Sequence, residues 1–313
     1  MKKDLKIAIV QDGPVYLDKE KSMEKAVSLI ETASTEGAEL IVFGETWLSG
    51  YPAWLDHCPE MGLWDHPATK EVFVQMYQNS VEVPGPETKI ISQLARQHSV
   101  VIGIGVNEVV ARGHANGTIF NSFLLFDEQG RLAVHHRKLM PTFTEKMVYG
   151  HGDGHGLRAA STSLGRIGGL ICWEHWMPLT RQAMHLEAEH IHLALWPKVH
   201  DMLQVASRSY AFEARCFVIA AGQIMRASDI PDGLKLPEHL AKAPETMILN
   251  GGSCIFGPDG SILLAPQFDV EGILYHELKN IPQLIGEKMA LDTSGHYNRN
   301  DVFRFGVKRK RVQ

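Results

Sequence analysis

Residues 167–175 of the chain read Ile167-Gly168-Gly169-Leu170-Ile171-Cys172-Trp173-Glu174-His175. The first five residues are apolar or glycine, which is typical of a buried β-strand. The run ends abruptly at a cysteine that is followed by large and polar side chains. A thiol at the exit of a buried strand can face a pocket, although a cysteine in an apolar run is more often a small buried hydrophobe. The stretch predicts a strand and leaves the role of Cys172 open.

Two other strand-like runs end in side chains that a reactive thiol would need. Residues 40–44 lead into Glu45, and residues 132–137 lead into Lys138. A carboxylate can take the proton from a thiol as a general base, and an ammonium can stabilise the negative charge that nucleophilic attack creates. Each of these residues, taken singly, would usually be read as a solvated side chain. Together with Cys172 at three strand ends, they make a hydrolytic site plausible.

Apolar patterns along the whole chain predict an α/β fold. The predicted strands cover residues 6–11, 40–43, 100–106, 119–126, 131–136, 167–171, 192–196, 217–221, 253–256, 261–265 and 271–277. The predicted helices cover residues 18–37, 67–80, 87–98, 178–187 and 200–214. Strands alternate with helices in places and form hairpins in others, so we expect mixed sheets covered by helices. We expect a loop at 46–66, mostly irregular chain at 139–166 and a surface insertion at 226–246.

The composition is that of a globular protein with an ordinary core. Of the 313 residues, 44% are hydrophobic and 21% are charged. Since no break in composition marks a boundary, we expect one domain over residues 1–313, with a short basic tail at 306–313. The net charge of -5 does not suggest a polyanion as partner, and we interpret the basic cluster at 308–311 as part of a solvated tail rather than a nucleic-acid site.

The sequence also carries signals about the compartment. No apolar run approaches the roughly 20 residues that cross a bilayer, and the N-terminus lacks the features of a signal peptide. We therefore expect a cytoplasmic protein with no membrane partner. The four cysteines form no CxxC pair, which in a reducing compartment indicates free thiols.

Three separate motifs resemble the signatures of the nitrilase family, which belongs to the carbon–nitrogen hydrolase superfamily. They are Phe43-Gly44-Glu45, His136-Arg137-Lys138-Leu139-Met140-Pro141-Thr142 and Cys172-Trp173-Glu174-His175-Trp176-Met177-Pro178-Leu179. The similarity runs from Lys6 to about Phe305, nearly the whole chain. It implies a four-layer α-β-β-α sandwich in one domain.

The resemblance also implies roles for individual residues. Cys172 matches the nucleophile, Glu45 the general base and Lys138 the cation beside the developing negative charge. Glu145 matches a second glutamate of the superfamily, whose implied role is to orient the lysine and the substrate. The backbone N–H of Trp173 is the expected second donor to the developing charge.

Aromatic side chains near the motifs suggest where the substrate binds. We hypothesise that Tyr51, Trp54 and Trp196 line an apolar substrate pocket, as aromatic groups often do. We expect Trp173 and His175, which follow the cysteine, to border the same pocket.

The residues after the cysteine resemble the nitrilase branch of the superfamily. The implied reaction converts an organic nitrile and water to a carboxylic acid and ammonia through a cysteine thioimidate and thioester. The alternative is an aliphatic amidase or a cyanide-hydrolysing relative. Phe143 and Thr144 stand where the family often has His and Val, and Lys146 where it has Arg, so the substrate preference cannot be carried over.

The resemblance implies no metal or organic cofactor. His185, His190 and His192 lie close in sequence, but the pair His190 and His192 spans a change from helix to strand, a spacing that does not favour a zinc site.

Family members associate, so we expect a homo-oligomer built from dimers, which in this branch often extend into spiral filaments. The helices at 178–187 and 200–214 are the candidates for the dimer face. The insertion at 226–246 is the candidate for a filament-forming contact.

Overall fold

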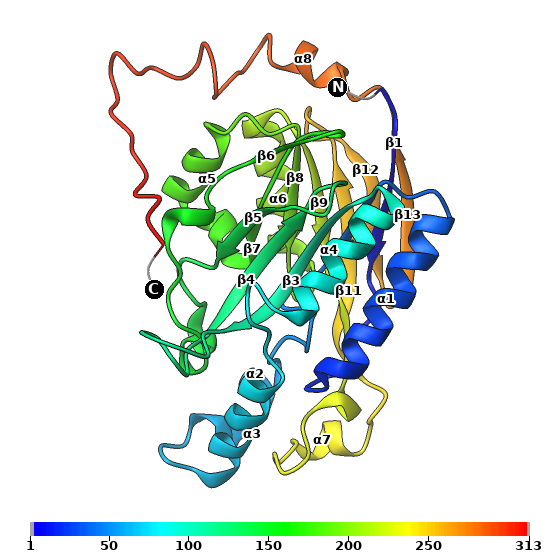
Figure 1. The fold of residues 1–313 in the computed structure, drawn as a ribbon, viewed down its shortest axis with the longest axis vertical. Helices are drawn as coiled ribbons and strands as arrows, with labels where there is room; N and C mark the ends of the chain where they lie inside the picture. Colours follow the sequence, from blue (N-terminus) through cyan, green and yellow to red (C-terminus); the bar gives the residue numbers. More distant parts are fainter. Residues whose placement is uncertain (1–2, 312–313) are drawn as a thin grey trace.

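The computed structural model describes residues 3–311 and contains two mixed β-sheets that pack face to face (Figure 1). The six strands of the first sheet follow the order β13 (Ile273–Leu278), β1 (Leu5–Val10), β2 (Leu40–Phe43), β3 (Val101–Val109), β4 (Ile119–Phe126) and β5 (Leu132–Arg137). The path of the second sheet is β10 (Ile224–Arg226), β11 (Met247–Phe256), β9 (Phe217–Ala221), β8 (Ile191–Leu195), β7 (Gly165–Ile171) and β6 (Ala160–Thr162), with β12 (Ile262–Phe268) paired to β11.

Helices cover the outer face of each sheet and complete the predicted four layers. The first sheet carries α1 (Lys19–Thr35) and α4 (Pro86–His98), and the second carries α5 (Pro178–His185) and α6 (Asp201–Ala214) (Figure 1). The side chain of Asp18 caps α1 by accepting a hydrogen bond from the backbone N–H of Lys21 at 3.0 Å, which is why the helix begins there.

The alternation of side chains along the strands divides the core into layers. In β1, Ile7 and Ile9 join the apolar cluster that fills the space between the two sheets, whereas Ala8 and Val10 join the cluster under α1 and α4. Successive side chains of a strand point to opposite faces, so an inner strand covered on both faces has to be apolar throughout. This explains the continuous apolar runs in the sequence.

Short elements beyond the ends of the strands form a third apolar cluster (Figure 1). They comprise α2 (Trp54–His57), α3 (Pro67–Gln78), α7 (Glu238–Ala241) and the 3₁₀ turns η1 (Pro59–Gly62) and η5 (Ala227–Asp229). The expectation of a surface insertion at 226–246 is therefore only partly right. Ile230, Leu234 and Leu240 are buried in this cluster, because the segment folds back over the region of α2 and α3.

The remaining elements are the 3₁₀ turns η2 (Phe143–Met147), η3 (Gly154–Gly156) and η4 (Cys172–Trp176), and the helix α8 (Gln283–Glu287). After α8 the chain crosses the outside of the molecule, and its last described residues lie against the body (Figure 1). Arg309 donates to the carbonyl of Leu157 at 3.1 Å, and Arg311 donates to the carbonyl of His135 at 2.8 Å. The prediction of a solvated tail fits Arg309, which stays exposed, but not Arg311, which is partly buried and bonded to a backbone carbonyl.

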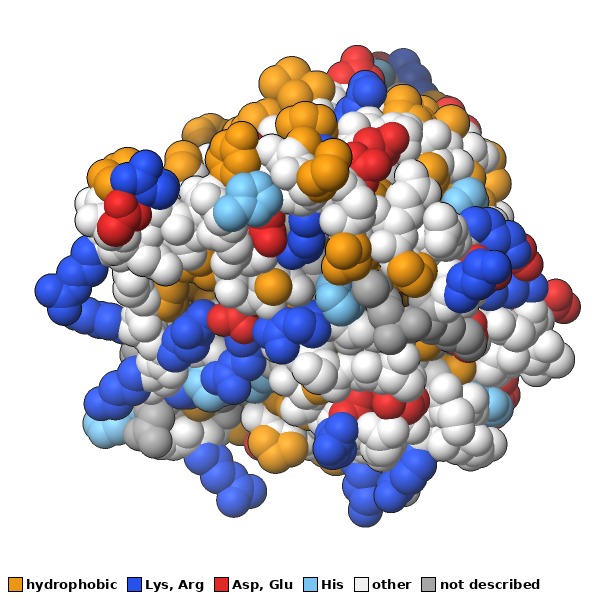
Figure 2. Space-filling model, turned by 90° about the horizontal axis from the view of Figure 1, so that it is seen from above, with side chains coloured by type: hydrophobic (Ala, Val, Ile, Leu, Met, Phe, Trp, Pro, Cys, Tyr) orange, Lys and Arg blue, Asp and Glu red, His pale blue; other side chains and the backbone are white. Residues whose placement is uncertain are grey.

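The surface carries its charges and apolar side chains unevenly. Figure 2 shows apolar side chains gathered over the upper half of one end of the molecule, with Lys and Arg side chains spread mostly over the lower half and the sides. Within residues 3–311, no helix is both long and apolar enough to span a membrane.

Candidate active site

The ends of strands β2, β5 and β7 meet at one place between the two sheets. Glu45 is the second residue after β2, Lys138 follows β5 and Cys172 follows β7. The segment that carries Glu45 can lie this close to β3 because position 105 is a glycine: a Cβ there would lie 2.3 Å from the backbone nitrogen of Thr46 and 2.4 Å from the carbonyl oxygen of Gly44. The structure thus brings together the three residues that the sequence places at strand ends.

The ammonium of Lys138 lies between two buried carboxylates. Its Nζ donates to Glu45 Oε1 at 2.8 Å and to the two oxygens of Glu145 at 3.0 and 2.7 Å. Glu145 also accepts hydrogen bonds from the hydroxyl of Tyr51 at 2.9 Å and from the backbone N–H of Thr142 at 2.9 Å. These contacts leave the lysine little freedom to move.

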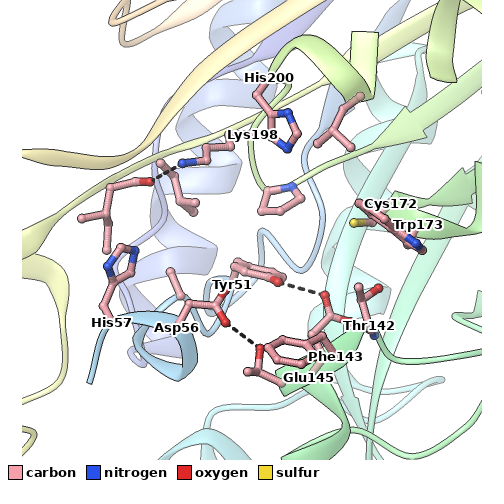
Figure 3. A pocket seen from close by; sticks show the side chains of 16 residues that line it. Tyr51, Asp56, His57, Thr142, Phe143, Glu145, Cys172, Trp173, Lys198 and His200 are labelled. Carbon is pink, nitrogen blue, oxygen red and sulfur yellow. Dashed lines mark hydrogen bonds between the residues drawn. The ribbon is translucent and has the colours of Figure 1, made fainter. Parts of the chain in front are cut away.

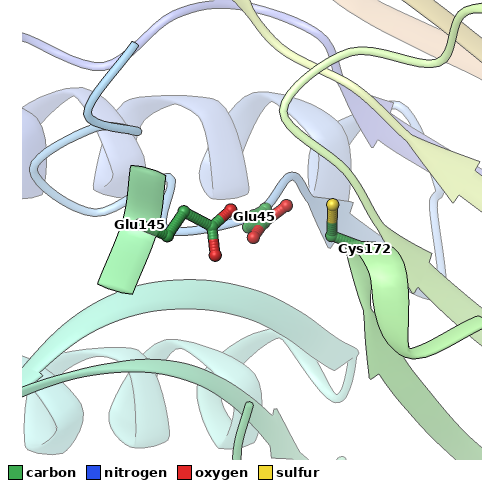
Figure 4. Close-up of side chains that lie close together, drawn as sticks. All are labelled: Glu45, Glu145 and Cys172. Carbon is green, nitrogen blue, oxygen red and sulfur yellow. The ribbon is translucent and has the colours of Figure 1, made fainter. Parts of the chain in front are cut away.

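Glu45 lies beside the thiol with one oxygen free. Oε1 accepts from Lys138 and from the amide of Asn121 at 2.7 Å, whereas Oε2 is buried and has no hydrogen-bond partner within the described part of the chain. Figure 4 shows the Glu45 carboxylate between Glu145 and the sulfur of Cys172, and the ligand-type atoms of these three residues all lie within 4.8 Å of one another. The free oxygen can accept the thiol proton.

The backbone bends sharply at the cysteine. Cys172 has a φ of 50°, in the left-handed region that side chains other than glycine rarely adopt. The extended strand β7 therefore stops at Ile171, and the chain turns directly into η4. Strained conformations of this kind persist only where the surroundings hold them, and they cluster at functional sites.

Glu174 ties the ends of two strands together. One of its oxygens accepts from the backbone N–H of Ile171 at 2.8 Å, and the other accepts from the backbone N–H of Leu139 at 2.9 Å. The ring of His136 lies 2.9 and 3.0 Å from the two oxygens. The carboxylate is fully buried, so it fixes the residue before the cysteine relative to the residue after Lys138.

The surroundings set the protonation states of the site. Burial raises the pKa of Glu45 to about 7, against the opposing attraction of Lys138 and with a further contribution from Glu145. Burial and the charge of Glu45 also raise the pKa of Cys172 well above its usual value. Burial alone would lower the pKa of Lys138, but the charges of Cys172, Glu45 and Glu145 hold it well above its usual range. The resting thiol is therefore protonated and needs a base to become nucleophilic.

Glu45, Glu145 and Cys172 would also suit a metal ion by residue type and spacing. The ammonium of Lys138 already occupies the space between the two carboxylates, at 2.8 Å from one and 2.7 Å from the other. Since the protein supplies its own cation at this position, the donor set does not fit a metal centre.

A cavity of about 230 Å³ opens onto this cluster (Figure 3). Cys172, Glu145, Tyr51 and Trp173 contribute to its lining, as expected for the last two from the sequence. The other lining residues are Ala53, Asp56, His57, Thr142, Phe143, Thr144, Pro197, Lys198, His200, Leu203, Ile248 and Leu249.

Three residues expected in the pocket lie outside its lining. Trp54 is fully buried in the cluster under α2, and Trp196 is fully buried with its indole N–H donating to Ser207 at 3.2 Å. His175 stacks on Trp196 with a ring separation of 4.8 Å, and its Nδ1 bonds the carbonyl of Cys172 at 2.7 Å. The expectation failed for these residues because large aromatic side chains are buried in the core as readily as in a pocket. His175 still contacts the site through the Cys172 carbonyl, and Trp196 packs against His175.

The sequence reasoning missed several residues that touch or hold the site. Asn121 donates to Glu45 from the middle of β4, and a polar residue inside the apolar run of that strand was a usable signal. Glu174 lies within the motif that follows Cys172, but the motif alone does not indicate its bonds to two strand ends. Lys198 on the pocket wall gave no signal in the sequence.

Comparison with known proteins decides the family. The family model described as carbon-nitrogen hydrolase matches residues 6–281. The chain belongs to the carbon-nitrogen hydrolase family. This carbon-nitrogen hydrolase is 36% identical over 318 residues to a nitrilase from Pseudomonas syringae pv. syringae, an alignment that covers 97% of this chain and 90% of that protein. It is 35% identical over 309 residues to a protein named nitrilase 2 from an unknown prokaryotic organism, with 98% and 93% covered.

Solved structures agree on the fold of this carbon-nitrogen hydrolase. A carbon-nitrogen hydrolase from Helicobacter pylori G27 superposes with a TM-score of 0.67 at 21% identity, covering 96% of this chain and 97% of that one. The predicted layered α/β fold with two sheets is confirmed.

Proposed function

We propose that this chain is a nitrilase that hydrolyses an organic nitrile to a carboxylic acid and ammonia. The observation that carries the proposal is the buried cluster of Glu45, Lys138, Glu145 and Cys172, of which Glu145 and Cys172 line a small cavity. The nitrilase relatives, at 35–36% identity, support the same branch of the family.

The first stage forms a bond between sulfur and carbon. Glu45 takes the thiol proton on its free oxygen, and the sulfur of Cys172 adds to the nitrile carbon. The electron pair of the nitrile moves to nitrogen, which takes the proton back from Glu45, so that a thioimidate forms. The ammonium of Lys138 and the backbone N–H of Trp173 stabilise the negative charge as it develops.

The second stage consumes two water molecules. Glu45 takes a proton from the first water as it adds to the thioimidate carbon, and the nitrogen leaves as ammonia after protonation. The resulting thioester is hydrolysed by the second water, which breaks the carbon–sulfur bond and restores the thiol. If the first tetrahedral intermediate expels the thiol instead, the product is an amide.

The size of the cavity favours small substrates. Its volume of about 230 Å³ lies below the roughly 300–1,000 Å³ of pockets that take drug-sized ligands.

We also propose that α5 and α6 contribute the contact in a dimer. They expose Leu179, Met202, Val205 and Phe212, whose exposed fractions are 72, 53, 51 and 46%. Residues 226–246 are our candidate for a second contact that extends a filament. We expect light scattering to give at least a dimer mass, and a monomer mass at working concentration would refute both contacts.

The test of the reaction is a product assay with matched substrates. The purified protein is incubated with aliphatic, aromatic and arylacetonitriles, with the corresponding amides and with cyanide, and ammonia, acid and amide are measured. We expect ammonia and acid from at least one nitrile, none from Cys172→Ala, and retained activity in Cys254→Ala, whose thiol is buried away from the pocket. Ammonia from amides or cyanide alone would move the protein to another branch of the family.

A further inference from the structure

A lysine lies on the wall of the substrate cavity away from the nucleophile. Figure 3 shows Cys172 and Trp173 on one side of the cavity, and Lys198 and His57 on the other, with Tyr51 between them. Lys198 is the second residue after the buried Trp196, in the connection from β8 to α6, and its side chain is only partly exposed.

The charge of Lys198 is poorly satisfied by the protein. An ammonium has three N–H donors. Here Nζ donates to the carbonyl of Ile248 at 3.1 Å, and within residues 3–311 no carboxylate lies within 4.0 Å of it. Other partly buried lysines have such a partner, for example Lys25 with Asp12 at 2.6 Å. A partly buried ammonium with no carboxylate beside it favours the binding of an anionic ligand.

The two ends of the cavity differ in their charged groups. At the end where the sulfur lies, the ammonium of Lys138 is already bonded to the carboxylates of Glu45 and Glu145, so that end offers no unpaired cation to an anionic group of the substrate. The lining also includes the apolar side chains of Leu203, Ile248 and Leu249, which can pack against methylene groups. A substrate with an anionic tail would therefore enter with its nitrile toward Cys172.

Asp56, His57 and His200 also line the cavity. The Oδ1 of Asp56 accepts from the hydroxyl of Thr144 at 2.7 Å, and Figure 3 shows Asp56 next to His57. Within residues 3–311, Asp56 forms no ion pair with Lys198, whose ammonium therefore remains available to a ligand. Burial first and the charge of Lys198 second lower the pKa of His200. Neutral imidazoles remain able to donate a hydrogen bond to a bound anion.

We propose that Lys198 binds a carboxylate at the far end of the substrate, so that the preferred substrates are short aliphatic nitriles with a terminal carboxylate. This proposal rests on the proposed nitrilase function and adds the substrate class. The reaction at the nitrile group of the substrate stays the same, and the products are the corresponding dicarboxylate and ammonia.

The experiment compares substrates that differ only at the tail. The matched pair is 4-cyanobutanoate and pentanenitrile, which share the chain and differ by a carboxylate in place of a methyl group. We measure the ratio of their kcat/KM values for the wild-type protein, for Lys198→Met and Lys198→Arg, and for Lys89→Met, which removes an exposed lysine of α4.

We expect the wild-type ratio to favour 4-cyanobutanoate by about 10- to 100-fold, the usual worth of one hydrogen bond to a charged group. Lys198→Met should lower the ratio by about that factor, whereas Lys198→Arg and Lys89→Met should retain most of it. A wild-type ratio near or below one, or a ratio unmoved by Lys198→Met, would overturn the proposal and leave the nitrilase function standing. Absence of turnover of every nitrile by the folded protein would instead refute the function itself.

Discussion

Replacing Glu174 by glutamine tests whether this carboxylate fixes the position of Cys172 relative to Lys138. The carboxylate accepts from the backbone N–H groups of Ile171 and Leu139 on different oxygens. Glutamine has one oxygen, so its amide NH₂ must face one of these two donors. A buried donor left without a partner costs about 1–3 kcal/mol. We expect the free energy of unfolding to fall by that amount.

The variant should also lose activity, because the hydrogen bonds of Glu174 fix the backbone next to Cys172 and Lys138. A displacement of about 1 Å in a reacting group can cost on the order of 10²-fold in rate. Thermal unfolding should show a lower midpoint, by roughly 2–4 °C for each kcal/mol. The assay is kcat on the best nitrile, measured beside the unfolding midpoint of each variant.

Two further variants serve as controls for the Glu174→Gln result. Glu31→Gln changes an exposed glutamate of α1 in the same way and should alter neither quantity. Glu174→Ala leaves both backbone donors unpaired and should cost about 2–6 kcal/mol. An unchanged kcat and midpoint in Glu174→Gln would show that the carboxylate does not hold the two strand ends together, and the reasoning would be wrong.

Three other predictions follow from the buried charges. Asn121→Leu removes a hydrogen-bond donor to the base Glu45, so the pKa of Glu45 should rise above about 7. The fall of kcat/KM on the acid side of its pH profile should therefore move to higher pH, and a profile that does not move would contradict this. Tyr51→Phe removes the hydroxyl bonded to Glu145 and should lower kcat/KM by about tenfold in steady-state kinetics, whereas a loss below about twofold argues against a positioning role. Burial raises the pKa of Glu189 from 4.5 to about 8, so the folded state holds a proton that the unfolded chain releases, and stability falls as pH rises through this window. Glu189→Gln should remove this dependence, and a thermal midpoint that falls as steeply as in the wild type between about pH 5 and pH 8 would refute it.

The strand ends were predictable from the sequence because the signal is local. Apolar runs that stop at Glu45, Lys138 and Cys172 mark both the burial of the strands and the place where their ends meet a cavity. The period of the side chains and the caps of the helices depend on neighbouring residues alone, so mixed sheets covered by helices could be inferred as well, whereas the four layers were implied by the resemblance to the nitrilase family.

The pocket wall was not predictable in the same way. Trp54 and Trp196 are fully buried, and nothing in their local sequence separates a core position from a pocket position. The bonds of Glu174 and the location of Lys198 depend on how the two sheets and the long connections lie against one another. Such contacts join residues far apart in the chain, which a pattern within one segment does not report.

The pair of carboxylates beside the nucleophile also bears on turnover. Glu45 and Glu145 lie within 4.8 Å of the thiol, and Lys138 can offset only one of their charges. An acid formed at that spot ionises next to them. Two like charges about 5 Å apart repel by about 3 kcal/mol at an effective dielectric constant near 20. If the proposed reaction takes place here, the carboxylates that activate the thiol also favour release of the acid product, which frees the cavity for the next substrate molecule.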